Sequence, residues 1–410
     1  MKKVWFVAHY AMPPQYEMRW KTYKYAKILQ EQGYDVTIFS ASTIHNKDIN
    51  LITDGSEYIE REYDGLKFIH INVCNYKGTA SPARIINMRQ FSSRFRKIAS
   101  RDMQAPDAIV SDANIVAYKP IWKYCKEHNV KFILDMRDLW PEGFVDYLGF
   151  SRKNPFISAC YARERKMYQR CDDVTFSIEG YGDYIKERGW ENKIDMNHMH
   201  YINNGVDIEE TIKNRQENVL EDADLTDDSK FRVCYVGSIR LVNNIGKLVD
   251  CAALLKDREP DVRILVYGIG DQEEALKKRC EEEGLDNILF KGFVDKKYIP
   301  YILSTVDSGL LVSSKVNLMR FGTSLNKHFD YMAAGKPIIS NIRAGYDMTE
   351  KYNCGIVLDN DNAEDLAEAI IRLKNMSKEE YEIICKNCTE AAKLFDYRVL
   401  TEKLRQIIEA

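Results

Sequence analysis

The sequence lacks the features that would assign it to several classes of protein. Ten cysteines are dispersed over 410 residues, and the close pair Cys385 and Cys388 has no second pair to complete a zinc site. We therefore expect reduced thiols and a cytoplasmic location. The apolar run that starts at Val4 ends within about six residues, which indicates a strand rather than a signal peptide or a membrane span. No tract is biased enough to indicate disorder.

A strong excess of one charge is also missing. Lys and Arg outnumber Asp and Glu by 30 to 25 over residues 1–205, and the counts over residues 206–410 are 29 and 37. A surplus of five positive charges over about two hundred residues is far below the basic surface of a nucleic-acid-binding protein. We therefore expect no nucleic-acid partner.

The sequence does contain two series of alternating strand and helix patterns. Runs typical of buried strands, such as VWFVAHY (4–10), are followed by helical patterns that end at glycine. The alternation predicts an α/β fold with two doubly wound Rossmann-like domains that face each other across a cleft. We expect an N-terminal domain at 1–205, a C-terminal domain at 206–385, and a helix at 386–410 that crosses back to the N-terminal domain. The acid-rich stretch 216–230 is interpreted as a linker.

The stretch FGTSLNKHFDYMAAGKPII (321–339) predicts an anion site at the entrance of a helix. We expect Ser324 to cap the helix and Gly335 to end it. Backbone N–H groups and the helix dipole favour a phosphate at such an entrance, and Lys327 adds a positive charge. Asn326 lies one turn before Asp330, an acid that suits vicinal ribose hydroxyls. An ordinary amphipathic helix with a serine cap is an equally good interpretation.

A second phosphate-binding element is predicted in YVGSIRLVNNIGK (235–247). The strand ends at Gly237, where a ligand can approach closely, and Arg240 and Lys247 follow. A solvated loop arginine is the alternative. The glycine turn at 268–270 lacks the third spaced glycine of the dinucleotide fingerprint, so NAD binding is disfavoured.

Taken in order, YVGSIR, YGIGDQEEAL, ILFKGFVDKKYIPYIL and the 321–339 stretch resemble the donor half of family 4 glycosyltransferases, which are retaining enzymes of the GT-B fold. HYAMPP, LDMRDLWPE and INNGVD agree with this in the first half, so the resemblance covers nearly the whole chain. It implies that Arg240 binds the diphosphate and that Asp330 contacts the ribose. The residues implied to touch the base or to shape the nucleotide pocket are Gly292, Phe293, Val294, Gly268 and Gly270.

The chain departs from this family at several positions. Gly322 stands eight residues before Asp330, where the family usually has a Glu that holds the transferred sugar. Asn243 or Asn244 stands near the position of the family's second diphosphate-binding Lys, so that Lys247 or Lys327 must supply the charge. Other differences are Pro13-Pro14 in place of glycines and Arg137-Asp138 in place of a His-Asp pair. This set resembles a subgroup associated with bacterial capsule and surface polysaccharide assembly.

The resemblance implies transfer of a sugar from a nucleotide-diphosphate sugar to an acceptor hydroxyl with retention of the anomeric configuration. A UDP-sugar is expected as the donor rather than a GDP-sugar. Arg240, Lys327 and the helix entrance would neutralise the departing diphosphate, so we expect no metal and no cofactor. Asp359 and Asp361 are interpreted as loop residues rather than as metal ligands. The expected acceptor is a glycan or a polyprenyl-linked glycan. The alternatives are a nucleotide-sugar epimerase of the same architecture and a non-catalytic nucleotide-binding subunit.

Acceptor-side residues are predicted at strand ends and at one helix start of the first domain. Arg137 and Asp138 follow a strand, where active-site residues collect, and either a catalytic or a structural Arg-Asp pair fits. His9 ends the first strand, and a buried structural histidine is the alternative. Arg19 starts the following helix, and a solvated position is the alternative.

Residues 84–101 (RIINMRQFSSRFRKIASR) contain six basic side chains and no acid. Such a helix could lie on the anionic inner face of the cell membrane, near a polyprenyl-linked acceptor. The alternative is a basic helix whose apolar stripe packs on the sheet.

Overall fold

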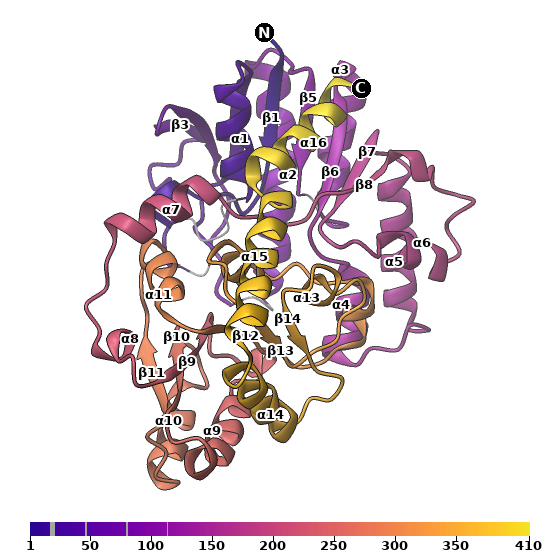
Figure 1. The fold of residues 1–410 in the computed structure, drawn as a ribbon. Helices are drawn as coiled ribbons and strands as arrows, with labels where there is room; N and C mark the ends of the chain where they lie inside the picture. The colour runs from indigo at the N-terminus through magenta and orange to yellow at the C-terminus, as the bar shows by residue number, and fades with distance from the viewer. Residues whose placement is uncertain (17–20, 46, 79–80, 113) are drawn as a thin grey trace. The chain divides into compact units, whose positions relative to one another are not determined.

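The computed structural model describes residues 1–16, 21–45, 47–78, 81–112 and 114–410, and it divides into two compact units. Unit 1 contains Met1–Asn203 together with Leu400–Ala410, and unit 2 contains Asn204–Val399. Each unit has its own sheet with helices packed around it (Figure 1). Arg19 lies outside the described residues.

Unit 1 is built on an eight-stranded sheet in the order β3-β4-β2-β1-β5-β6-β7-β8. All neighbouring strands are parallel except the antiparallel pair β3–β4. The strands are β1 (Lys3–Val7), β2 (Asp35–Ala41), β3 (Tyr58–Tyr63), β4 (Leu66–Ile71), β5 (Ala108–Ser111), β6 (Lys131–Met136), β7 (Asp173–Phe176) and β8 (Met199–Tyr201).

The helices of unit 1 begin and end at signals that the sequence contains. The side chain of Ser81 accepts the N–H of Ala83 at the start of α2, and Gly149 adopts a positive φ of 68° at the end of α4. These helices are η1 (Pro14–Tyr16), α1 (Lys21–Glu31), α2 (Pro82–Asp102), α3 (Tyr118–His128), α4 (Trp140–Leu148), α5 (Pro155–Tyr168), α6 (Tyr181–Glu187), η2 (Met196–His198) and most of α16 (Tyr397–Glu409).

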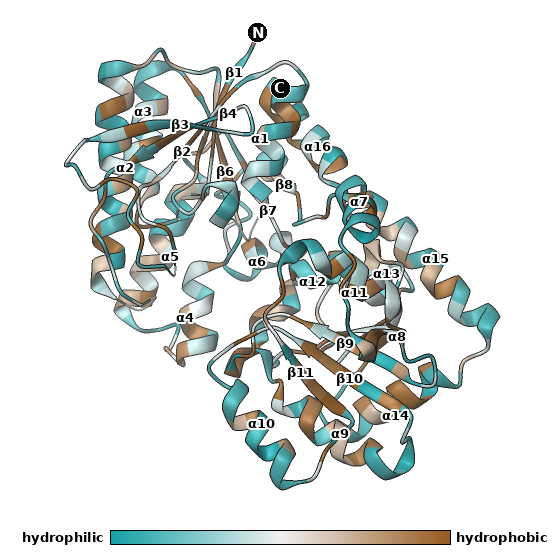
Figure 2. Cartoon of the chain, turned by 90° about the vertical axis from the view of Figure 1, so that its left-hand side faces the viewer, coloured by the Kyte–Doolittle hydropathy of each residue, from teal (hydrophilic) through white to brown (hydrophobic). Residues whose placement is uncertain are grey.

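Unit 2 is built on a six-stranded, fully parallel sheet in the order β11-β10-β9-β12-β13-β14. Its inner strands β9 and β10 are hydrophobic along much of their length, as expected for strands covered on both faces (Figure 2). The strands are β9 (Phe231–Val236), β10 (Val262–Tyr267), β11 (Ile288–Gly292), β12 (Ser308–Leu311), β13 (Ile338–Ser340) and β14 (Gly355–Val357).

Amphipathic helices cover this second sheet. One core cluster joins Leu248 and Leu255 of α9 and Ile370 of α14 to Ile264 of β10, and all four side chains are fully buried. The helices are α7 (Ile208–Glu217), α8 (Ala223–Thr226), η3 (Leu241–Asn243), α9 (Gly246–Arg258), α10 (Glu273–Glu282), η4 (Lys296–Tyr298), α11 (Ile299–Thr305), η5 (Asn317–Phe321), α12 (Asn326–Ala333), α13 (Met348–Lys351), α14 (Ala363–Lys374) and α15 (Lys378–Leu394).

The predicted fold class of two doubly wound α/β domains is confirmed, with two local corrections. Strand β3 was not predicted from the sequence, and it pairs with β4 across a turn in which Asp64 and Gly65 both have positive φ. The stretch 216–230 is more than a linker, because it contains α8. Lys291 holds this segment to the sheet by ion pairs with Asp222 (2.8 Å) and Asp224 (2.6 Å).

The end of the chain forms two helices. Residues 386–394 are the last part of α15 in unit 2, whereas unit 1 includes the chain from Leu400 onward. There Lys131 Nζ donates to the carbonyl oxygen of Ile407 at 2.5 Å, and Tyr34 donates to Glu409. No helix in the described part of the chain has the length and apolarity that a bilayer span requires.

Candidate functional site

Three glycines stand at the carboxyl ends of neighbouring strands in unit 2. Gly237 follows β9, Gly268 follows β10, Gly292 ends β11, and all three have positive φ. A Cβ on Gly268 would lie 1.8 Å from the carbonyl oxygen of Gly237, and one on Gly270 would lie 2.0 Å from that of Ile239. The turn at 268–270 is therefore glycine-rich because two strand-end loops pack backbone against backbone.

The entrance of α12 differs from the prediction. The N-cap residue is Leu325, and no side chain caps the helix, so the expected Ser324 cap is wrong. The Ser324 hydroxyl instead accepts the N–H of Asn204 at 3.4 Å, and the Asn204 amide donates to Asn326 Oδ1 at 3.1 Å. At the other end, Gly335 has a φ of 66° and ends the helix as predicted. The first turn therefore presents N–H groups without a side-chain cap, which suits an anion.

Lys327 lies in this first turn, and no described residue accepts a hydrogen bond from its amine. Its Nζ is 4.0 Å from the centroid of the Tyr235 ring and would be 3.5 Å from a Cβ on Gly237. The side chain forms no hydrogen bond or ion pair within the described part of the chain, and burial lowers its pKa to about 7. An anion beside Gly237 would supply the missing partner.

The other predicted cations of unit 2 lie in the loop and helix after β9. Arg240 is exposed at the start of η3, and Lys247 is half-buried near the start of α9. Neither side chain has a hydrogen bond or ion pair among the described residues. Lys327 is the lysine that points toward the end of β9, so it fits the second diphosphate-binding position better than Lys247 does.

The predicted ribose and base contacts lie around the same edge of the sheet. The Asp330 side chain is half-buried without a hydrogen-bond partner among the described residues, and burial raises its pKa although Lys296 opposes the shift. Phe293, after β11, is exposed, and Val294 beside it is half-buried. Ile269, after β10, is exposed as well. An apolar rim of this kind can receive a flat base.

Tyr346 was not among the predicted residues. It has a φ of 53°, which is rare for a bulky side chain, and its ring is exposed in the loop after β13. The N–H groups of Gly345 and Gly322 both donate to the carbonyl oxygen of Met319, each at 2.9 Å. Tyr346 therefore belongs to the loop that is hydrogen-bonded to the Gly322 turn. Its positive φ indicates a candidate functional residue, and this backbone angle is known only from the structure.

Both carboxylates of the 359–361 loop, Asp359 and Asp361, are bound by side chains of the protein. Asp361 accepts hydrogen bonds from Asn341 (2.8 Å) and Asn244 (3.2 Å), and Asp359 forms an ion pair with Arg343 at 2.5 Å. Within the described ranges, no group of three His, Cys, Asp or Glu side chains could hold a metal ion.

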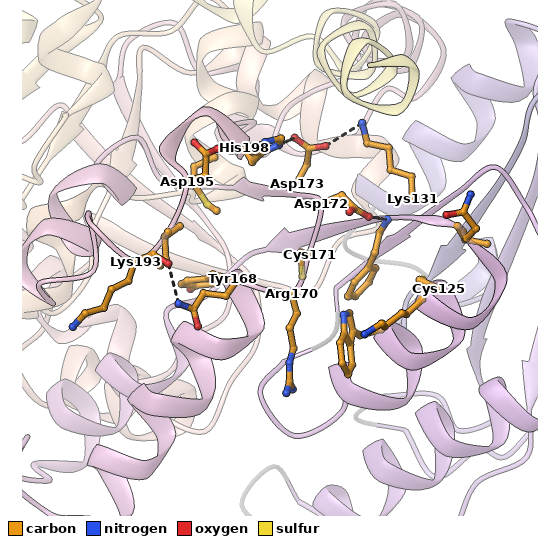
Figure 3. Close-up of a pocket in the computed structure, with 18 residues that line it drawn as sticks. Cys125, Lys131, Tyr168, Arg170, Cys171, Asp172, Asp173, Lys193, Asp195 and His198 are labelled. Carbon is orange, nitrogen blue, oxygen red and sulfur yellow. Dashed lines mark hydrogen bonds and ion pairs between the residues drawn. The ribbon is translucent and has the colours of Figure 1, made fainter.

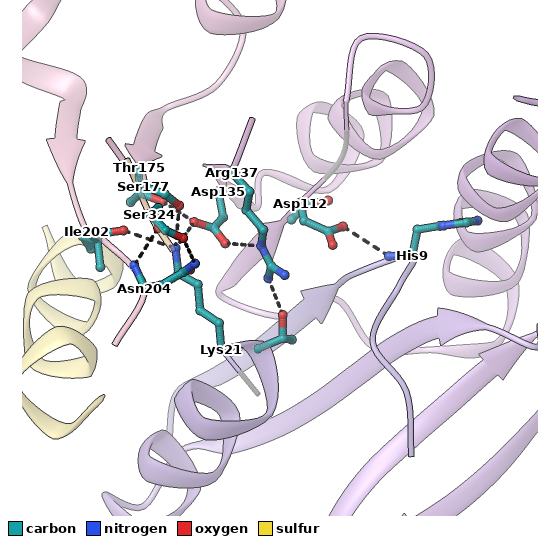
Figure 4. Close-up of polar contacts among 12 residues, drawn as sticks. His9, Lys21, Asp112, Asp135, Arg137, Thr175, Ser177, Ile202, Asn204 and Ser324 are labelled. Carbon is teal, nitrogen blue, oxygen red and sulfur yellow. Dashed lines mark hydrogen bonds and ion pairs between the residues drawn. The ribbon is translucent and has the colours of Figure 1, made fainter. Parts of the chain in front are cut away.

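In unit 1, the carboxyl end of β6 carries a buried ionic network (Figure 4). Asp135 accepts from Lys21 Nζ at 2.9 Å and from Arg137 Nε at 3.1 Å, and Arg137 also donates to Thr22 Oγ1 at 2.6 Å. Lys21 donates further to Ser177 (3.3 Å) and to the carbonyl oxygen of Ile202. Burial alone would raise the pKa of Asp135, but the two cations lower it.

In this network the Arg137 and Asp138 side chains are not paired with each other, and an acceptor-side role for either residue stays a prediction. Arg137 bonds to Asp135 rather than to Asp138, which is exposed and has no side-chain partner in the described part of the chain. Lys21 and Asp135 were not predicted as site residues. The sequence indicates them only weakly, because Asp135 is a charged residue in an otherwise buried strand and Lys21 is a charged residue at the start of a helix. Arg137 is thus fixed by protein groups, while Asp138 is free to contact a ligand.

His9 is buried at the same edge of unit 1. Its Nε2 lies 2.5 Å from Asn87 Oδ1, its backbone N–H donates to Asp112, and Nδ1 has no partner among the described residues. Burial lowers the pKa of His9 to about 4, so the ring is neutral at pH 7. These contacts match the buried structural histidine that the sequence left open.

A pocket of about 1010 Å³ lies at the opposite, amino-terminal edge of this sheet (Figure 3). Asp173 at the start of β7 binds Lys131 (3.1 Å) and His200 (2.8 Å), and Arg170 lies 4.3 Å from the centroid of the Trp122 ring. Doubly wound sheets bind ligands at the carboxyl ends of their strands, so we assign no ligand to this pocket.

Helix α2 contains the basic stretch 84–101. Its apolar stripe of Met88, Phe91, Phe95 and Ile98 is buried, as the alternative interpretation holds. Several of its cations have protein partners: Arg96 pairs with Glu127, and Lys97 and Arg101 both pair with Glu57.

Comparisons with known proteins agree with this geometry. Residues 218–394 match the family model described as glycosyl transferases group 1. TuaH of Bacillus subtilis, named as a teichuronic acid biosynthesis glycosyltransferase, is 27% identical over 227 residues, which cover 54% of this chain and 53% of TuaH. The chain spans about half the length of the curated relatives that it matches.

Solved structures are similar over the whole length. Alr3699/HepE of Anabaena, in complex with UDP and glucose, superposes with a TM-score of 0.68 at 14% identity and covers 100% of both chains. Sucrose-phosphate synthase from Thermosynechococcus elongatus has a TM-score of 0.71 at 16% identity and covers 100% of this chain and 98% of that one. These likenesses show the fold, two Rossmann-like α/β units as in GT-B proteins.

Proposed function

We propose that this protein is a glycosyltransferase that moves a sugar from a nucleoside-diphosphate sugar to an acceptor hydroxyl. The observation that carries the proposal is Lys327, whose amine has no acceptor among the described residues and lies beside Gly237 at the end of β9. A diphosphate there would meet this amine and the uncapped first turn of α12. The match of residues 218–394 to glycosyl transferases group 1 supports the same reaction class.

We infer a UDP-sugar donor. The similar fold of HepE holds UDP and glucose, which supports UDP over GDP. In the proposed arrangement, Arg240 and Lys327 bind the diphosphate, Asp330 accepts hydrogen bonds from ribose hydroxyls, and Phe293 and Val294 contact the base. Gly268 and Gly270 act indirectly, because they allow the two strand-end loops to pack.

The proposed chemistry is metal-independent transfer with retention of configuration. Negative charge develops on the departing diphosphate as the glycosidic bond breaks, and Arg240, Lys327 and the α12 entrance stabilise that charge. The leaving diphosphate then accepts the proton of the attacking hydroxyl. Tyr346 replaces the usual Glu as a contact for the sugar, since its exposed ring lies on the loop bonded to the Gly322 turn.

The acceptor is proposed to be a glycan on a polyprenyl carrier in bacterial surface polysaccharide assembly. The 27% identity with TuaH over half of the chain supports a polysaccharide acceptor. Asp138, exposed after β6, would contact the acceptor, and Arg137 would contact an acceptor phosphate from the position that Asp135 and Thr22 fix. The anionic-membrane contact expected at residues 84–101, at the inner face of the cell membrane, stays a prediction.

Calorimetric titration with UDP tests the proposal. We expect the wild-type protein to bind UDP and Lys327→Met to bind at least about tenfold more weakly, because the variant loses a charge-assisted contact. Lys278→Met, which removes an exposed lysine of α10, serves as the control and should bind like the wild type. A wild-type protein that ignores UDP and every other nucleoside diphosphate would contradict the proposal.

Product analysis separates transfer from its two alternatives. An epimerase would convert a UDP-sugar without any acceptor, whereas a transferase releases UDP only when an acceptor is supplied. A non-catalytic subunit would bind nucleotide and yet transfer no sugar when a membrane extract supplies acceptors. Release of UDP that depends on this extract is the expected result.

A further inference from the structure

We propose that a surface of unit 1 docks the protein on an anionic phospholipid bilayer. This surface, called the α4–α5 surface, consists of α4, the loop after it and the outer face of α5. Its members are Trp140, Phe144, Tyr147, Leu148, Phe150, Phe156, Lys153, Arg163 and Lys166. The inference does not depend on the transfer reaction, because it concerns adhesion to lipid only.

The first observation is a cluster of exposed apolar side chains. Within ten residues of chain, Tyr147, Leu148, Phe150 and Phe156 are 54%, 63%, 40% and 59% exposed. The ring of Phe144 joins the two helices, since its centroid lies 6.2 Å from that of Phe156 and 5.9 Å from that of Trp140. Single exposed apolar residues are ordinary, but a contiguous group of this size marks a contact surface.

The second observation is that α4 has inverted polarity. Its buried residues are Pro141 and the acid Glu142, while Trp140 and Phe144 are half-buried and Tyr147 and Leu148 are exposed. Glu142 accepts hydrogen bonds from Arg152 and from Tyr161 of α5, so a buried carboxylate joins α4 to α5. A helix on a water-facing surface turns its apolar stripe inward, so α4 is built to face an apolar medium.

The third observation is the charge around the apolar cluster. Lys153 and Lys166 are exposed, and their amines have no hydrogen bond or ion pair within the described ranges, while Arg163 is exposed and donates one guanidinium N–H to the carbonyl oxygen of Ile115. Of the three acids between residues 140 and 168, Glu142 and Glu164 are buried and bonded, which leaves Asp146. The outward charge is positive and complements anionic headgroups.

These observations favour a bilayer over a second protein chain. Tyr and Trp rings prefer the headgroup level, and long lysine side chains reach from an apolar layer to phosphates. A bilayer contact needs exposed apolar side chains and positive charges that are not already paired. Helix α2 has the exposed apolar residues Ile85 and Ile86, but its Arg96, Lys97 and Arg101 are already paired. The α4–α5 surface has both features. Since α4 follows β6 directly, docking would bring the Arg137 edge of unit 1 to the bilayer.

Vesicle sedimentation of the full-length protein tests the inference. We expect binding to phosphatidylcholine vesicles that contain about one third phosphatidylglycerol and much weaker binding to phosphatidylcholine alone. Leu148→Glu/Phe156→Glu should lower the partition coefficient at least tenfold, and Lys153→Gln/Lys166→Gln should lower it about 25-fold on the anionic vesicles only. The matched controls are Ile86→Glu on α2 and Ile383→Glu on α15, which are similarly exposed and should bind like the wild type.

Three results would overturn the inference. The wild-type protein could stay in the supernatant with anionic vesicles. Ile86→Glu could release the protein as strongly as Leu148→Glu/Phe156→Glu, which would move the contact to α2. Light scattering could show a dimer that Leu148→Glu/Phe156→Glu dissociates, which would make the surface an interface between copies. Thermal unfolding checks that each variant is folded, and UDP titration of the same samples reports separately on the proposed function.

Discussion

The carboxyl edges of the two sheets each carry an inward-pointing lysine, and the two lysines have opposite surroundings. In unit 1, Lys21 is 2% exposed and is bonded to Asp135, Ser177 and a backbone carbonyl. In unit 2, Lys327 has the face of the Tyr235 ring and no acceptor within the described part of the chain. Burial lowers the pKa of both amines, but only Lys21 has a carboxylate that opposes the shift.

This difference separates a structural cation from a binding cation. A buried charge needs a partner, and unit 1 supplies that partner from its own chain. In unit 2, no described residue is an ionic partner for Lys327, and this lowers the free energy of unfolding unless an anion from solution binds to its amine. The two arginines differ in a similar way: Asp135 and Thr22 fix the position of Arg137, whereas Arg240 is exposed and has no partner among the described residues.

The largest expected effect is the loss of stability in Lys21→Met. The substitution leaves Asp135 buried with one cation fewer, so the free energy of unfolding should fall by about 3–5 kcal/mol. Lys327→Met should change it by less than about 1 kcal/mol, because the loss of the cation–π contact with Tyr235 is offset by removal of a buried charge that has no acceptor among the described residues. Urea unfolding of both variants measures the difference. Equal losses would show that the two lysines have equivalent roles.

The next effect concerns Arg240. Arg240→Ala should reduce turnover by about 10²–10³-fold, because the variant loses charge stabilisation of the departing diphosphate. Its thermal unfolding should stay unchanged, since the side chain has no partner among the described residues. Arg372→Ala, which removes another exposed arginine on α14, is the matched control. Unchanged turnover in Arg240→Ala would remove this residue from the proposed mechanism.

A smaller effect is expected from placing at position 322 the Glu that the resemblance to family 4 glycosyltransferases would imply there. Gly322 has φ 105° and ψ 174°, a backbone conformation that is essentially confined to glycine. Gly322→Glu should therefore lower the free energy of unfolding by about 1–3 kcal/mol and should not raise turnover. Denaturation and sugar-transfer assays measure the two effects. A stable and more active variant would show that the turn can accept the Glu after all.

The smallest effect is the pH dependence of UDP binding. Because the pKa of Lys327 is lowered to about 7, the free protein loses this proton above pH 7, and UDP must then bind with proton uptake. Affinity should fall about tenfold per pH unit above 7 while the complex keeps its proton, and this group should cause no change below pH 7. Calorimetry between about pH 6 and 9 measures it. Lys327→Met should abolish the dependence, whereas a slope that persists would assign it to another group.

Local patterns in the sequence were sufficient for the fold class and for several site residues. The periodic apolar runs and glycine stops predicted two doubly wound units, and Gly335 ends α12 as expected. They were insufficient for β3, because a hairpin strand with three consecutive exposed charged residues, Glu60, Arg61 and Glu62, resembles a loop. Ser324 was misassigned because Asn204, far away in the sequence, provides its hydrogen-bond partner.

The sequence by itself determined which residue types gather at the strand ends, since periodicity and turn signals act over a few neighbouring residues. Only the tertiary structure decided which charges are already satisfied. The Lys21–Asp135 pair spans 114 residues of sequence, and the inverted polarity of α4 depends on Arg152 and on Tyr161 of α5. Packing of distant residues decides which cations are buried in a low dielectric and which of them have a partner, and therefore whether a cation stabilises the fold or can bind a ligand.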